Sequence, residues 1–547
     1  MSNRQPWEGA VGAFIIASIL VAAHGCIRDY GTGGTGELVV PKHELRTVES
    51  TTLEQVAVPP TTQISATQPA TQPVPEVHLT LEEVRQLALQ NNLDLHVELL
   101  EPTIAKTFVS EERAQYELLL TADARYANLD TPTASQLSGS QVRDFSFAPG
   151  LIIPLITGGN IRLSVPLDRF ETNNQFSTLN PAYTSDAAAS LSIPLLRGAG
   201  VQVNSQRIRV AFYDYQATEA RTKLEVIRVL AAVDRVYWRL YAARQQLDVR
   251  RKEYELADQQ LQRARRLVNA GAAPEVEVIR AESGVADRLE AIIIAENLLR
   301  DRQRDLKRIL NDPTLPMGGP TAILTATPPN ATAYRIDPDR AVALALRQRM
   351  EMLEQELRIA REESTVAFAR NGLLPLLTLD YTYNVNGLGD SWNDSFSMVG
   401  DKDFEDHTVG LRLEVPVGNE GARSRLRRAL ASRLQALASK EQRIALITQE
   451  VLNAIDQLEA NWQRILAAQQ RVVLAARTLD AETRQFEQGL RTSTEVLDAQ
   501  ARLADAQSSE VNAITEYQIS QVDIAFAAGM LLGASNVQWD PIPAPRY

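Results

Sequence analysis

The chain has 547 residues, 44% of them hydrophobic and 23% charged, with a formal net charge of −12. That length allows several domains, and the acidic balance argues against a nucleic-acid partner because it leaves no basic surplus to neutralise phosphates. The five histidines lack metal-ligand spacing, and no HExxH, phosphate-loop or dinucleotide motif occurs. We therefore expect no catalytic site, no metal and no cofactor.

The N-terminal residues 1–26 have the pattern of an export signal. Ala10–Ala23 is apolar but only 14 residues long, which is short for a bilayer span and typical of a signal peptide. Small residues precede Cys26, the sole cysteine, as in a bacterial lipobox, and we predict that Cys26 is lipidated. An ordinary cleavage site nearby and an uncleaved anchor are the alternatives. Ile27, which is not Asp, points to the outer membrane.

Residues 27–76 are rich in Thr, Pro and Gln, a composition that buries no core and predicts a linker. Beyond it, three sequence blocks of the first half recur in the same order in the second half, which indicates an internal duplication. We place the first repeat at 77–312, a Pro-rich linker at 313–336, the second repeat at 337–533 and a tail at 534–547. The matched blocks are Leu87–Leu95 with Leu344–Met352, Ser192–Gly200 with Glu414–Ala422, and Asn269–Glu282 with Glu487–Gln500.

Each repeat contains a very long predicted helix and its return. Apolar residues follow a sustained 3.5-residue period, which indicates coiled-coil packing. A helix over about 200–270 would be about 100 Å long. Gly271 and Gly489 interrupt the two runs, so each repeat should form a helical hairpin that turns at its glycine. The heptad positions are Val226, Leu230, Val233, Tyr237, Leu240 and Leu247, and Ile444, Ile447, Val451, Ala454, Leu458, Ile465, Val472 and Leu479.

Strand-like segments of alternating apolar and polar residues lie at about 120–197 in the first repeat and about 375–417 in the second. Leu411 and Leu413, for example, lie on one face of such a strand and Arg412 on the other. These strands fit a transmembrane barrel with lipid outside and water inside, although those of a soluble sandwich alternate in the same way. One chain supplies too few strands to close a barrel, and lipid tolerates no open sheet edge, so a barrel requires several chains.

The strands and long helical hairpin, repeated twice behind a lipobox, resemble the TolC family of outer-membrane efflux proteins over about 77–533. The most specific segment is Phe486–Leu503, which is similar to the family's second inner hairpin turn; Leu195–Gly200 and Ala525–Gly533 also fit. The resemblance implies an α+β membrane protein, a homotrimer with one outer-membrane β-barrel continued by a periplasmic coiled-coil tunnel of twelve helices. It implies a passive channel in outer-membrane lipid, with a periplasmic adaptor and an inner-membrane pump as partners.

The same resemblance implies a gate at the periplasmic end of the helices. The family's two acidic aperture residues fall on Glu495 and Asp498, and the arginine that ties the closed gate falls on Arg491, with Glu277 as its acidic partner. A tyrosine of that network falls on Phe486, which has no hydroxyl. The turns at Gly271 and Gly489 would be the surfaces that contact the adaptor.

The residues themselves permit two interpretations of this segment. Glu495 and Asp498 are three apart and share a helix face beyond a turn, so three copies would line a pore with carboxylates that attract cations. The alternative is an ordinary solvated helix face with an Arg491–Glu495 pair.

The first repeat is longer than the second between its matched helix start and its strand exit. The excess includes Phe145–Ile156 and Ile161–Glu171, joined tightly at Gly158–Asn160. We therefore predict four strands in the first repeat and two in the second, which would give a trimer 18 strands rather than the family's twelve. Pro149 and Pro166 are unfavourable inside such strands.

Two other classes of function fit the sequence less well. The main alternative is a periplasmic coiled-coil scaffold or adaptor whose strands form a small soluble domain; the duplicated strand segments argue against it. A secreted hydrolase finds no support, because no Ser/His/Asp or paired-carboxylate arrangement occurs. Small molecules, metals and proteins are all compatible with the sequence as the exported cargo.

Overall fold

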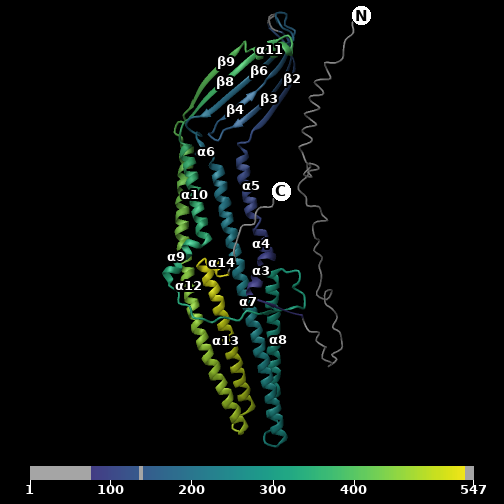
Figure 1. The fold of residues 1–547 in the computed structure, drawn as a ribbon, viewed down its shortest axis with the longest axis vertical. Helices are drawn as coiled ribbons and strands as arrows, with labels where there is room; N and C mark the ends of the chain where they lie inside the picture. The colour runs from purple at the N-terminus through teal and green to yellow at the C-terminus, as the bar shows by residue number, and fades with distance from the viewer. Residues whose placement is uncertain (1–74, 135–138, 536–547) are drawn as a thin grey trace, which may run out of the picture. The chain divides into compact units, whose positions relative to one another are not determined.

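The computed structural model describes residues 75–134 and 139–535. The predicted signal peptide, Cys26, nearly all of the linker 27–76 and most of the tail 534–547 lie outside the described residues. Within them, the same order of elements occurs twice, with short helices, then strands, then a long helical hairpin (Figure 1).

One antiparallel sheet contains all the strands that lie between the short and the long helices. Its order is β2, β3, β4, β6, β8, β9, and β5 lies beyond the end of β4, between β3 and β6. Val165 and Pro166 separate β4 from β5, which together fill one strand position. The sheet therefore has four positions from the first repeat and two from the second, as predicted. The strands are β2 Leu119–Asp130, β3 Gln141–Pro154, β4 Asn160–Ser164, β5 Leu167–Thr172, β6 Ala182–Pro194, β8 Leu376–Gly389 and β9 Glu405–Glu414.

The long helices pack side by side in a single layer rather than in a bundle. Near the sheet, α7 packs on α5 and α10, and α10 packs on α12; farther away, α7 packs on α8 and α13, and α13 packs on α12 (Figure 1). The layer therefore ends at α12 on one side and at α5 and then α8 on the other. The helices are α5 Glu101–Ala114, α6 Val201–Asn204, α7 Gln206–Asn269, α8 Val276–Leu310, α10 Met350–Asn371, α12 Glu420–Glu487 and α13 Ser493–Ala527.

Apolar side chains buried between neighbouring helices stabilise these helices along much of their length. The predicted positions Val226, Leu230, Val233 and Tyr237 are fully buried. In the second repeat, Ile447, Val451, Leu458 and Ile465 are buried. The heptad prediction is confirmed at these positions. Among the described residues, no helix is both long enough and apolar enough to cross a membrane.

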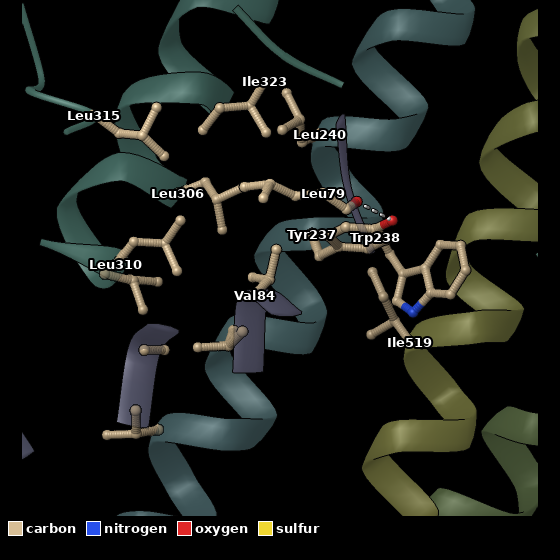
Figure 2. Packing of buried hydrophobic residues seen from close by; sticks show 14 residues of the cluster. Leu79, Val84, Tyr237, Trp238, Leu240, Leu306, Leu310, Leu315, Ile323 and Ile519 are labelled. Carbon is tan, nitrogen blue, oxygen red and sulfur yellow. Dashed lines mark hydrogen bonds between the residues drawn. The ribbon is translucent and has the colours of Figure 1, made fainter. Parts of the chain in front are cut away.

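A belt of short helices and a two-stranded sheet packs on the middle of α7 and α12 and on the C-terminal end of α8. Figure 2 shows its core, where the Tyr237 hydroxyl donates to the carbonyl of Leu79 at 3.1 Å and Leu306 and Leu310 of α8 pack opposite. β1 Glu76–Leu79 pairs in parallel with β7 Ala322–Thr325, so the predicted linker 313–336 contains a strand that the sequence did not reveal. The belt helices are α3 Leu81–Asn91, α4 Leu93–Glu98, α9 Pro338–Gln348 and α14 Leu531–Ala534.

The segment 386–406 is rich in Asn, Ser, Asp and Gly, a composition typical of loops, yet it contains a helix. β8 extends to Gly389, and a helix, α11 Trp392–Asp401, follows before β9 begins. Ser391 caps this helix by accepting a hydrogen bond from the Asp394 N–H. The helix packs on β8 and β6.

Candidate functional site: the hairpin tips and the two-faced sheet

Both hairpins turn at the predicted glycines and with the same hydrogen bonds. After α7, the Gly271 N–H donates to the carbonyl of Val268, and the Ala272 N–H donates to that of Leu267. This pair of bonds is the Schellman motif, which needs a left-handed residue at its centre. Gly271 has φ +71°, a conformation that glycine adopts without a Cβ penalty.

The second hairpin repeats this geometry. Gly489 has φ +73°, its N–H donates to the carbonyl of Phe486, and the Leu490 N–H donates to that of Gln485. Phe486 itself is buried. The two tips are therefore built alike.

Glu277 joins one tip to the other. It lies in the first turn of α8, and its Oε2 accepts a hydrogen bond of 2.7 Å from the backbone N–H of Ser493, the first residue of α13. Its Oε1 accepts from Arg280 at 2.6 Å, and the residue is only 7% exposed. A carboxylate at a helix N-terminus also interacts favourably with the helix dipole. Burial raises the pKa of Glu277, but the bonds from Ser493 and Arg280 outweigh burial and hold the pKa below its usual value.

This pKa direction predicts how the tips respond to acid. A carboxyl group whose pKa is lowered by folding stabilises the fold fully above its unfolded value and loses that contribution as pH falls through the folded value. The usual value is 4.5. The melting temperature of wild type, followed by circular dichroism, should exceed that of Glu277→Gln above about pH 4.5. The difference should shrink as pH falls below that point; a difference independent of pH would contradict this account.

Within the single chain, Arg491 does not pair with Glu277, its predicted partner. Its guanidinium instead pairs with Glu495 at 2.6 Å and Glu482 at 3.1 Å, both in the second hairpin. Glu277 is already occupied by the N–H of Ser493 and by Arg280. The Arg491–Glu495 pair is the one that the alternative interpretation of this segment predicts.

The two predicted pore carboxylates have different surroundings. Glu495 forms a capping box with Thr492, whose backbone N–H donates to Glu495 Oε2 at 2.7 Å. That bond is the first cause that lowers the pKa of Glu495, and the bond from Arg491 is the second. The side chain of Asp498 is exposed and makes no hydrogen bond or ion pair with any residue in 75–134 or 139–535. Asp498 therefore presents an uncompensated negative charge, whereas Arg491 offsets that of Glu495.

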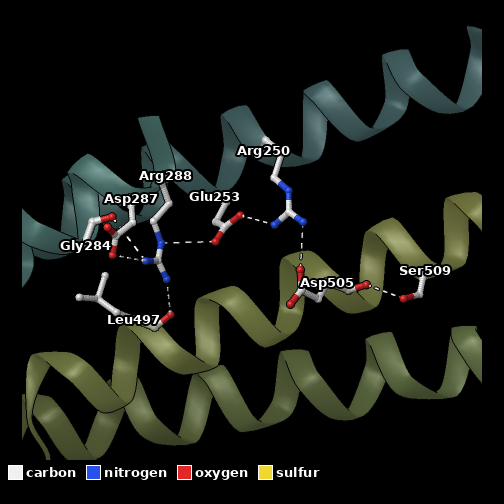
Figure 3. Close-up of polar contacts among 8 residues, drawn as sticks. All are labelled: Arg250, Glu253, Gly284, Asp287, Arg288, Leu497, Asp505 and Ser509. Carbon is white, nitrogen blue, oxygen red and sulfur yellow. Dashed lines mark hydrogen bonds and ion pairs between the residues drawn. The ribbon is translucent and has the colours of Figure 1, made fainter. Parts of the chain in front are cut away.

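On the sheet side of the tips, an ionic network and one close contact join the first hairpin to the second (Figure 3). Arg288 of α8 lies 3.3 Å from the carboxylate of Glu253 on α7 and donates to the carbonyl of Leu497 on α13 at 3.0 Å. Arg250 bridges Glu253 at 2.8 Å and Asp505 of α13 at 3.0 Å.

Next to this network, Gly284 lets the helices approach closely. A Cβ at this glycine would lie 2.7 Å from Leu497 Cδ1. Sequence reasoning missed these residues, because one sequence with many Arg and Glu does not show which pairs cross between helices.

The sheet has one apolar face and one polar face. Across the strands, Leu120 pairs with Leu151, Leu151 with Leu163, and Leu379 with Leu411, all on one face. The neighbouring pairs lie on the other face and are polar, such as Ser192 with Asp380 and Thr378 with Arg412. The two edge strands, β2 and β9, have no partner on their outer sides within the described residues.

Helices at the edges of the layer also expose apolar side chains. On α8, Ile293 is 60% exposed and Ile294 63%; on α12, Leu474 is 58% exposed. Phe108 of α5 is 56% exposed. Because β2 follows α5 and β9 precedes α12, each lateral edge of the chain combines an unpaired strand with an apolar helix face.

Comparison with known proteins bears on the same regions. The family described as outer membrane efflux protein matches residues 163–312 and 341–530. The outer membrane protein TolC of Vibrio cholerae is 24% identical over 327 residues, which are 60% of this chain and 72% of that protein. The pyoverdine export outer membrane protein OpmQ of Pseudomonas aeruginosa is 24% identical over 372 residues, which are 65% of this chain and 74% of that protein.

Solved structures show the same fold. The Campylobacter jejuni outer membrane channel CmeC superimposes with a TM-score of 0.61 and 16% identity, over 82% of this chain and 86% of that one. CusC gives a TM-score of 0.62 at 16% identity, over 82% and 92%. Because the family match covers more than half of the residues, this chain belongs to the outer membrane efflux protein family.

Proposed function

We propose that the chain is the passive outer-membrane exit duct of a tripartite efflux or type I secretion system, working as a homotrimer. Its strands would close one barrel, its helices would form the periplasmic tunnel, and the hairpin tips would gate that tunnel. The observation that carries this proposal is the pair of lateral edges, in which a free strand is aligned with an exposed apolar helix face.

These edges support a closed ring of copies. β2 and β9 run in opposite directions, so β9 of one copy can extend the antiparallel sheet by pairing with β2 of the next. A contact between two different surfaces of identical chains closes into a ring when the rotation fits. A sheet that spans a bilayer must close into a barrel, because an open sheet edge leaves backbone groups without hydrogen-bond partners in the lipid.

Three copies of six strand positions would give a barrel of 18 strands. The additional hairpin β3–β4/β5 pairs inside the sheet, between β2 and β6, and so would enlarge the barrel wall. Because barrel diameter grows roughly linearly with strand number, such a barrel would be about 1.5 times as wide as one of twelve strands.

The tips would be the contact with a periplasmic adaptor, and an inner-membrane pump would select the cargo. Lipidation of Cys26 belongs to this proposal as a second attachment to the outer membrane. The alternative, a scaffold or adaptor with a soluble β domain, would have to cover the wide apolar face of the sheet with other protein.

Disulfide crosslinking tests the ring. In a Cys26→Ala background, Ala124→Cys in β2 is combined in turn with Val409→Cys, Leu411→Cys and Leu413→Cys in β9, all on the apolar face. We expect one β9 position to give a covalent ladder that ends at three chains on denaturing gels.

The matched control replaces the β9 cysteine with Leu379→Cys in β8. This residue lies on the same face but one strand away from the edge, and it should not crosslink between copies. No crosslink at any β9 position, or a ladder that ends at two chains, would contradict the trimeric barrel.

A further inference from the structure

The helix α11 is seated on the apolar face of the sheet. Gly387 and Gly389 lie on the same face of β8 as Val385, because side chains alternate along a strand. A Cβ at Gly387 would lie 2.2 Å from the carbonyl oxygen of Ser395, and one at Gly389 would lie 2.7 Å from its nitrogen. The hydroxyls of Ser185 and Ser395 hydrogen-bond beneath the helix. The two glycines thus make room for α11 on that face.

Helix α11 is amphipathic, with an apolar and a polar flank on either side of the residue that faces the sheet. With about 100° per residue, Trp392, Phe396 and Val399 fall on one flank when Ser395 faces the sheet. The opposite flank carries Asp394, Ser397 and Asp401, and Met398 lies between this flank and the sheet. Trp392 packs edge-on against Tyr183 with ring centroids 5.0 Å apart, whereas Phe396 is 46% exposed.

An apolar groove lies on the same face of the sheet. It has a volume of about 460 Å³, and the small side chains of Ala187 and Ala189 form its floor. Leu151 and Leu163 also line it, as does Val385, which is buried. Val385 is two positions from Gly387, over which α11 lies.

We propose that α11 is an interfacial helix on the outside of the barrel rim, and that it holds an outer-leaflet lipid whose acyl chain lies in the alanine groove. The inference rests on the proposed barrel, which makes the apolar face of the sheet the lipid-facing one. A helix with one apolar and one charged flank and exposed aromatic residues fits the boundary between headgroups and acyl chains. A second copy is the less suitable occupant, because β9 separates β8 from the edge where copies would meet.

Photo-crosslinking in reconstituted membranes tests the inference. The photoreactive residue p-benzoylphenylalanine replaces Phe396 in the otherwise native chain, and the protein is placed in vesicles of dioleoylphosphatidylcholine. We expect irradiation to give a phosphatidylcholine adduct, identified by mass spectrometry. Substitution at Ser397, on the polar flank of the same helix, is the matched control and should give none.

Two further positions separate this inference from the proposed function. Leu411 lies on the apolar face of β9 away from α11, and Leu388 lies on the opposite face of β8. Adducts at Leu411 but not at Phe396, or a crosslink from Phe396 to another copy, would overturn the lipid role of α11 and leave the barrel intact. No adduct at Leu411, or adducts at Leu388 instead, would overturn the barrel itself and α11's role with it.

Discussion

Replacing Glu277 by Ala should raise the single-channel conductance of the purified protein in planar bilayers several-fold. The change removes the acceptor of the Ser493 N–H at a nearly buried position where the two hairpin tips meet. An unsatisfied buried donor costs about 1–3 kcal/mol. In the proposed trimer, three symmetric copies would lose that contact together, and about 1.4 kcal/mol already changes a two-state equilibrium tenfold. The closed arrangement of the tips should therefore lose most of its population.

Glu282 provides the matched control for this experiment. It is an exposed carboxylate on the same helix and pairs with Arg265 of the same hairpin at 2.7 Å, so it does not join the two tips. Glu282→Ala should leave the conductance at the wild-type value. Equal conductance of Glu277→Ala and wild type would show that the contact between the tips does not hold the tunnel closed.

Asp498→Asn should reduce the preference of the channel for cations, and by more than Glu495→Gln does. Asp498 is exposed and unpaired among the described residues, whereas Arg491 offsets the charge of Glu495 at 2.6 Å. A ring of three free carboxylates concentrates cations at a constriction. Reversal potentials in a salt gradient measure the preference, and block by a trivalent cation should weaken in parallel.

Arg491→Gln should be compared with Asp498→Asn, because the two variants change the charge in opposite directions. It removes the positive charge beside Glu495, so it should raise cation preference where Asp498→Asn lowers it. Unchanged reversal potentials in both variants would mean that these residues form an ordinary solvated helix face.

Regular patterns made the larger elements predictable from the sequence. Strict heptads such as Val226 to Tyr237 identify a buried seam, because the residues that face a neighbouring helix recur every 3.5 positions. Gly271 and Gly489 mark the turns, because the motif that ends each helix there needs a left-handed residue. The additional strands of the first repeat also followed from alternation, and Pro166 broke their run, as a missing N–H should.

The contacts between elements could not be predicted in the same way. The Glu277–Ser493 bond joins residues 216 positions apart through a backbone N–H, which carries no side-chain signature. The helix α11 lies in a segment rich in Asn, Ser, Asp and Gly, a composition typical of a loop. Its signal in the sequence was the spacing of Trp392, Phe396 and Val399 after the cap Ser391. A pattern of three residues is too short to outweigh that composition. The pairing of β1 with β7 joins two short segments of unremarkable sequence.

The two unpaired edge strands have a consequence for biogenesis. A single chain that entered the bilayer would expose the free backbone groups of β2 and β9 to hydrocarbon, which is strongly unfavourable. Insertion of the proposed barrel must therefore be coupled to the meeting of all three chains. Its rate should rise steeply with the concentration of exported protein, and lone chains in the periplasm should depend on holding chaperones until partners arrive.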